Sequence, residues 1–164
     1  FDIALDTSKE VMIAAARHKR ASVVEILQNC VIFNTGIHSR LCDAAHREEH
    51  TIHLRHGEKM LFGKDLKKGL VQEGFGLKAV TIGEDGYTLD DVLVHDAHCE
   101  DNFLQQRLAM MDGDTLPLAI GVIRDYNSIS YETAVAEQVR EVKAKYGFDS
   151  LRTMIEKTHE TWTV

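Results

Sequence analysis

Cys30 follows directly on an apolar, β-branched run and is the residue of this sequence best placed for chemistry. The run Val23-Val24-Glu25-Ile26-Leu27 predicts a buried strand over about residues 22–28. Open α/β sheets bind their ligands beyond the carboxyl ends of the strands, so a thiol at this position suits a ligand-binding role. Spacing alone favours a plainer interpretation, because free cysteine is among the most buried residue types.

Two groups of potential metal ligands form a second candidate. His46, His50, His53 and His56 are closely spaced, and residues 95–100 place two histidines, a cysteine and two carboxylates together. Zinc prefers nitrogen and sulfur donors in a tetrahedral set. The first group crosses an expected change from helix to strand, so its rings should diverge, and the second has no paired CxxC or HxxxH motif. A zinc-binding or protein-interaction domain is therefore kept as the alternative hypothesis.

The surrounding patterns predict an α/β fold, with a mainly parallel sheet and flanking helices. A capping box of Thr7 and Glu10 and an apolar stripe predict a helix over residues 8–19, which leads into the strand that ends before Cys30. The remaining expected elements are possible helix at 39–49, strands at 51–54, 59–62, 77–83 and 118–123, and helices at 101–111, 130–146 and 149–157, followed by a loose tail.

Composition narrows the class of protein. The chain has 164 residues, 44% of them hydrophobic and 27% charged, with a formal net charge of −7. This charge argues against nucleic acid as a partner, and no apolar run reaches the ~20 residues that span a bilayer. Three cysteines without a CxxC spacing favour a reducing cytoplasm. Phe1, in place of an initiating Met, suggests a cut or processed end.

Several segments in order resemble one enzyme family. Residues 25–34, which surround Cys30, resemble the β-subunit signature of 2-oxoacid:ferredoxin oxidoreductases. Segments 56–64, 80–86, 94–96 and 120–125 are similar to the same family in the same order. The resemblance covers about residues 1–130 and implies the C-terminal part of a thiamine-diphosphate-binding β subunit. Residues 131–164 would then be a C-terminal helical extension.

The family resemblance implies a reaction and its cofactors. Its enzymes cleave a 2-oxoacid oxidatively on coenzyme A, releasing carbon dioxide and an acyl-CoA and reducing ferredoxin. They use thiamine diphosphate with Mg²⁺ and a [4Fe-4S] cluster, and their β subunit works with an α subunit. Gln28-Asn29-Cys30 points to the 2-oxoglutarate branch, where pyruvate-type relatives more often have proline before the cysteine.

Carried onto this sequence, the family's fourth cluster cysteine is Cys30. The other three ligands, and the acidic GDG motif that holds Mg²⁺ and the diphosphate, lie in the family's N-terminal half. This sequence has neither a CxxC nor a metal-binding GDG motif, since Asp85-Gly86 and Gly113-Asp114 stand in the wrong place. It also has Thr35 where many relatives carry Asp. We therefore expect the chain alone to be catalytically inactive.

Overall fold

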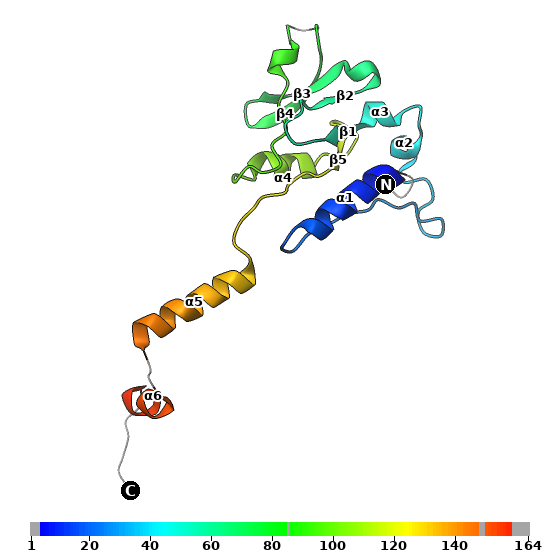
Figure 1. Cartoon of the computed structure of the whole chain (residues 1–164). Coiled ribbons are helices and arrows are strands. Elements are labelled where there is room, and N and C mark those ends of the chain that lie inside the picture. The colour runs from blue at the N-terminus through cyan, green and yellow to red at the C-terminus, as the bar shows by residue number, and fades with distance from the viewer. Residues whose placement is uncertain (1–3, 85, 148–149, 159–164) are drawn as a thin grey trace. The chain divides into compact units, whose positions relative to one another are not determined.

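The computed structural model describes residues 4–84, 86–147 and 150–158 and divides the chain into two compact units (Figure 1). The larger unit is Phe1–Asn127 and the smaller is Ser128–Val164. Both sheets belong to the larger unit. The sequence-based division at residue 130, with its functional assignment of the two parts, stays a prediction.

A pair of parallel strands forms the centre of the larger unit. β1 (Thr51–Leu54) pairs with β5 (Leu118–Gly121), with Thr51 opposite Leu118 and Leu54 opposite Gly121. Gly121 has a φ of +99°, and a Cβ atom there would lie 2.7 Å from the Leu54 carbonyl oxygen. Only glycine fits both this conformation and this close approach.

The second sheet is antiparallel, with strand order β2-β3-β4. β2 is Leu61–Phe62, β3 is Lys68–Glu73 and β4 is Gly76–Thr81. β3 and β4 form a hairpin whose turn places Phe75 in solvent, 84% exposed. The α/β class, the parallel pairing and the flanking helices are as expected. The parallel sheet, however, has two strands among the described residues, and the strand predicted at 77–83 pairs antiparallel.

One apolar core joins the two sheets. Helix α4 (Phe103–Ala109) contributes Leu108, which is fully buried. Side chains from β1, β2, β3 and the segment after α4 pack with it, because alternate residues of each strand face the same side. The buried members of the cluster are Ile52, Leu54, Met60, Phe62, Leu70, Leu108 and Met111.

The first helix forms where it was expected but begins earlier. α1 spans Leu5–Arg17, with Ala4 at the N-cap and no side-chain cap. The predicted capping box is therefore wrong, since Thr7 already lies inside the first turn. Asp6 in this turn and Arg17 in the last turn complement the helix dipole.

The buried strand predicted at 22–28 is wrong. Residues 21–29 are irregular coil, and Val23 is 97% exposed. The backbone of residues 21–27 makes no hydrogen bond in the described structure. A β-branched run becomes a strand only when a neighbouring strand supplies those bonds, and none of the described strands does so here.

Short helices complete the larger unit. α2 is Ser39–Cys42 and α3 is Arg47–His50, so the stretch expected to be helical at 39–49 is broken in two. The 3-10 turns η1 and η2 span Lys64–Leu66 and Leu89–Asp91.

The smaller unit consists of two helices. α5 spans Tyr131–Tyr146, where the Ser130 hydroxyl accepts the Thr133 N–H and left-handed Gly147 ends the helix, and α6 spans Leu151–Thr158. The expected stripe of Val135, Val139, Val142 and Tyr146 is largely exposed, so it forms no core within the described chain. The predicted loose tail lies outside the described residues. No described helix has the length and apolarity needed to cross a membrane.

Gly121→Ala should destabilise the larger unit more than Gly57→Ala. Both glycines have a positive φ, which costs a non-glycine residue about 1–3 kcal/mol. A Cβ at Gly57 meets nothing within 4 Å, whereas one at Gly121 collides with the Leu54 carbonyl. Urea unfolding of the two variants measures the difference. Equal losses of unfolding free energy would show that β1 and β5 do not approach as closely as described.

Candidate functional site

Cys30 lies on an exposed turn braced by side-chain hydrogen bonds. The Asn34 N–H donates to the Cys30 carbonyl at 3.0 Å, which closes the turn. The Thr35 hydroxyl donates to the Val31 carbonyl at 2.8 Å, and the Gly36 N–H donates to Asn29 Oδ1 at 2.8 Å. These bonds fix the loop around the thiol without help from a strand.

The turn surrounds the Cys30 sulfur with backbone donors. The N–H groups of Phe33, Ile32 and Asn34 point toward the thiol and lower its pKa from the ordinary value. Backbone N–H groups stabilise a thiolate because they donate to its negative charge. The same donors set the potential of iron–sulfur clusters. The thiol of Cys30 is therefore exposed, with a pKa lowered by the backbone of its own turn, and is not the buried thiol that spacing alone favoured.

The residues next to Cys30 are apolar and face solvent. Val31, Ile32 and Phe33 are all strongly exposed. Three large apolar side chains in a row on a surface turn are unusual for a free surface and typical of one that another chain covers.

The other cysteines do not join Cys30. All three are free thiols, and Cys42 and Cys99 are partly buried. Among the described residues, no three His, Cys, Asp or Glu side chains converge to hold a metal ion. The zinc hypothesis therefore has no structural support in the described part of the chain.

The first histidine group diverges, as the sequence predicted. His46 Nδ1 contacts Asp43 Oδ2 at 2.9 Å, and His50 Nδ1 donates to the Gly113 carbonyl at 2.9 Å. His53 is half-buried on β1, and burial lowers its pKa.

One histidine from each group meets beyond the carboxyl ends of the parallel strands. His56 follows β1, and its ring centroid lies 4.2 Å from that of His98. His98 Nδ1 donates to the Asp125 carbonyl at 2.6 Å, and the Ala97 N–H donates to His56 Nδ1 at 3.3 Å. From the sequence alone the two groups were separate candidates. His98 directly follows no described strand, so its approach to His56 had no signal in the sequence.

His95, from the same segment as His98, is buried. Its side chain is 1% exposed, and Nε2 donates to the Val122 carbonyl at 3.0 Å. Burial lowers the pKa of this imidazole, so the ring is neutral in the folded protein near pH 7.

A polar strap joins the end of α1 to the segment after β5. His18 Nδ1 lies 2.8 Å from Asp125 Oδ1. The Arg20 guanidinium donates to the Tyr126 carbonyl and to Asn127 Oδ1, each at 3.0 Å. These contacts hold the start of the coil at 21–29 beside the end of β5.

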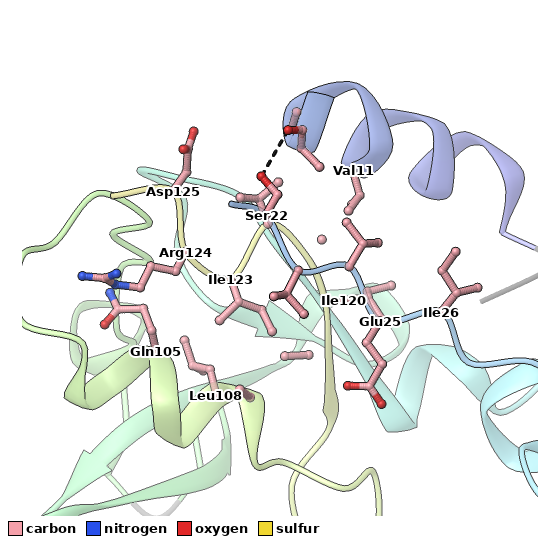
Figure 2. A pocket seen from close by; sticks show the side chains of 18 of the residues that line it. Val11, Ser22, Glu25, Ile26, Gln105, Leu108, Ile120, Ile123, Arg124 and Asp125 are labelled. Carbon is pink, nitrogen blue, oxygen red and sulfur yellow. Dashed lines mark hydrogen bonds between the residues drawn. The ribbon is translucent and has the colours of Figure 1, made fainter. Parts of the chain in front are cut away.

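A groove of about 700 Å³ lies between this coil, α1, α4 and β5. Figure 2 shows Val11 on α1 and Leu108 on α4 pointing into it from opposite sides. Gln105, 3% exposed, also lines the groove. Its Nε2 donates to the Asp96 carbonyl at 2.6 Å, and its Oε1 has no partner in the described structure.

Comparison with known proteins gives one clear relationship. The 2-oxoglutarate oxidoreductase subunit KorB of Mycobacterium tuberculosis is 33% identical over 168 aligned residues, which cover 98% of this chain. The chain is a homologue of a C-terminal portion of that subunit. It spans 44% of the relative's length. No protein-family model matches the chain, and no solved structure matches it.

This homology confirms the family that the segments around Cys30 and His56 indicated. Cys30, His56 and His98 all lie within the larger unit.

The Cys30 thiol should ionise at lower pH than an ordinary cysteine. In a Cys42→Ser/Cys99→Ser background, the rate of alkylation by iodoacetamide reports Cys30 alone. The inflection of its pH profile should fall below that of an ordinary cysteine, because the turn N–H groups stabilise the thiolate and lower its pKa. Unfolding in urea should move the inflection back up. A profile unaffected by urea would contradict the described turn.

His95 should make the folded state sensitive to acid. Its folded pKa is below the unfolded value of about 6.5, so the unfolded chain binds more protons as the pH falls below that value. Unfolding free energy should therefore decline below about pH 6.5, by at most about 1.4 kcal/mol per pH unit for this group. His95→Gln keeps a donor for the Val122 carbonyl and should make the decline less steep, leaving the part due to His53. If the pH dependence of the unfolding free energy is unchanged in His95→Gln, a group other than His95 causes the acid sensitivity.

Proposed function

We propose that this chain is a C-terminal part of the β subunit of a 2-oxoglutarate:ferredoxin oxidoreductase. Such an enzyme converts a 2-oxoacid and coenzyme A into an acyl-CoA and carbon dioxide and passes the electrons to ferredoxin. The observation that carries the proposal is the Cys30 turn, where backbone donors favour a thiolate, in a chain homologous to KorB.

Cys30 is proposed as one of four thiolate ligands of a [4Fe-4S] cluster. When bound, this cluster would carry electrons singly toward ferredoxin. The N–H groups of Phe33, Ile32 and Asn34 would hydrogen-bond the ligating sulfur and tune the potential. The remaining three ligands would come from the rest of the subunit, since Cys42 and Cys99 do not converge with Cys30 among the described residues.

Thiamine diphosphate and Mg²⁺ do not fit the residues of this chain. Beside a diphosphate, Mg²⁺ is held by one or two carboxylates together with the phosphate oxygens, and the acidic GDG motif that would supply them in the family is missing from this sequence. We therefore assign the diphosphate site to the rest of the subunit and expect the isolated chain to be inactive.

The proposed substrate and partners follow from the homologue and from residues 28–30. KorB is a subunit of a 2-oxoglutarate oxidoreductase, and the family resemblance of Gln28-Asn29-Cys30 points to the same branch. The partners would be the α subunit of the same enzyme and ferredoxin, in the cytoplasm. The exposed apolar turn at residues 31–33 supports contact with another chain near the cluster.

Cys30→Ser in the complete subunit should lower bound iron and cripple ferredoxin reduction. A cluster that loses one of four thiolates opens to solvent and becomes labile. Iron content, the visible absorption of the cluster and ferredoxin reduction measure the effect. Cys42→Ser and Cys99→Ser are the matched controls and should retain all three.

Normal iron and electron transfer in Cys30→Ser would contradict the proposed role. An equal loss in Cys42→Ser would show that a different thiol is the ligand.

A further inference from the structure

The outer edge of β5 is an unfilled position for a strand. β5 has β1 as its one neighbour in the described sheets. In a parallel pair, alternate residues direct their backbone N–H and C=O groups to opposite edges, so half of those on β5 point away from β1. An open, apolar strand edge readily pairs with another extended segment.

The coil on the other side of the groove, residues 21–27, also has no described strand paired with its backbone. The backbone of residues 21–27 has no hydrogen bond in the described structure, and Val23 is almost completely exposed. The segment is rich in β-branched residues and has about the length of a typical strand, roughly 5–6 residues. It therefore has the composition of a strand and lacks only a neighbour.

The groove between β5 and the coil is lined largely by apolar side chains, as a protein interior is. Its walls carry Val11, Leu108 and Ile123, and the side-chain oxygen of Gln105 faces no donor although the residue is buried (Figure 2). A buried acceptor without a partner costs about 1–3 kcal/mol, so an occupant that offers an N–H group would relieve this cost.

The chain's own contacts keep the groove open. The Ser22 hydroxyl donates to the Ala15 carbonyl at 3.1 Å, which ties the start of the coil to α1. His18 and Arg20 bind the segment after β5, at one end of the groove. At the far end, Asn29 holds the Cys30 turn. The coil is thus held along the groove and makes no backbone hydrogen bond with β5 in the described structure.

We propose that the groove receives a β-strand from the remainder of the same subunit, paired with the outer edge of β5 and with residues 21–27. This inference rests on the proposed function. The chain spans 44% of KorB, so more than half of that subunit has no counterpart here and supplies ample chain for such a strand. The occupant presents apolar side chains to α1 and α4 and its backbone to the two free edges.

The test uses this chain together with the part of Mycobacterium tuberculosis KorB that it does not match, expressed with an affinity tag. The two should co-purify. Amide hydrogen exchange of residues 21–27 and 118–123 should become at least about tenfold slower in the complex than in the chain alone. Slow exchange already present in the chain alone would mean that the coil or a second copy closes the groove, and would overturn the proposal.

Val23→Asp and Phe75→Asp form a matched pair of variants. Both residues are large, apolar and strongly exposed, so neither change should unfold the chain, but only Val23 lines the groove. Val23→Asp should abolish co-purification, while Phe75→Asp on the distant hairpin should leave it intact. Equal binding by both variants would overturn the proposal.

The remaining outcomes separate this inference from the proposed function. If a complex forms but amide hydrogen exchange at 21–27 and 118–123 does not slow, the strand is refuted and the proposed function is unaffected. If no complex forms, the proposed strand is refuted. Protected strands combined with full iron in Cys30→Ser would keep the strand and refute the proposed role of Cys30.

Discussion

The close approach of β1 and β5 is the constraint on which the rest of the larger unit depends. These strands are far apart in sequence, and their backbones meet where Gly121 lies against the Leu54 carbonyl. Everything between them, including the antiparallel sheet and α4, must fold back so that this pair can form. The buried cluster around Leu108 then stabilises the arrangement, because it joins side chains from both sheets.

The same pairing brings together two of the segments that resemble the enzyme family. Gly57 donates its N–H to the His95 carbonyl at 2.8 Å, and the His95 N–H donates to the Glu58 carbonyl at 2.9 Å. Lys59 and Val94 continue the contact as a bridge. Segments 56–64 and 94–96 are thus one structural feature, which places His56 beside His98 at the strand ends.

Elements that depend on local sequence signals were predicted well from the sequence. The element that depends on pairing with a distant strand was not. Helix α5 could be predicted closely because Ser130 and Gly147 mark its ends. Strand β1 was predicted from its alternating pattern and β5 from a short apolar run. The run at 22–28 carries equally strong strand signals, yet strand formation depends on a neighbour that a sequence pattern cannot supply. The surroundings of Cys30 show this limit: the sequence predicted a thiol just past a buried strand, and the structure places Cys30 on an exposed turn.

The position of Cys30 on a surface turn has a consequence for assembly. A metal cluster ligated there, with its other ligands on a different part of the protein, is also a cross-link between the two parts. The free energy of metal binding then adds to the free energy of association, and each stabilises the other by thermodynamic linkage. Iron supply would thereby govern how firmly the Cys30 turn, with its exposed Val31, Ile32 and Phe33, stays covered. For the proposed cluster, loss of iron would therefore weaken the association of the two parts.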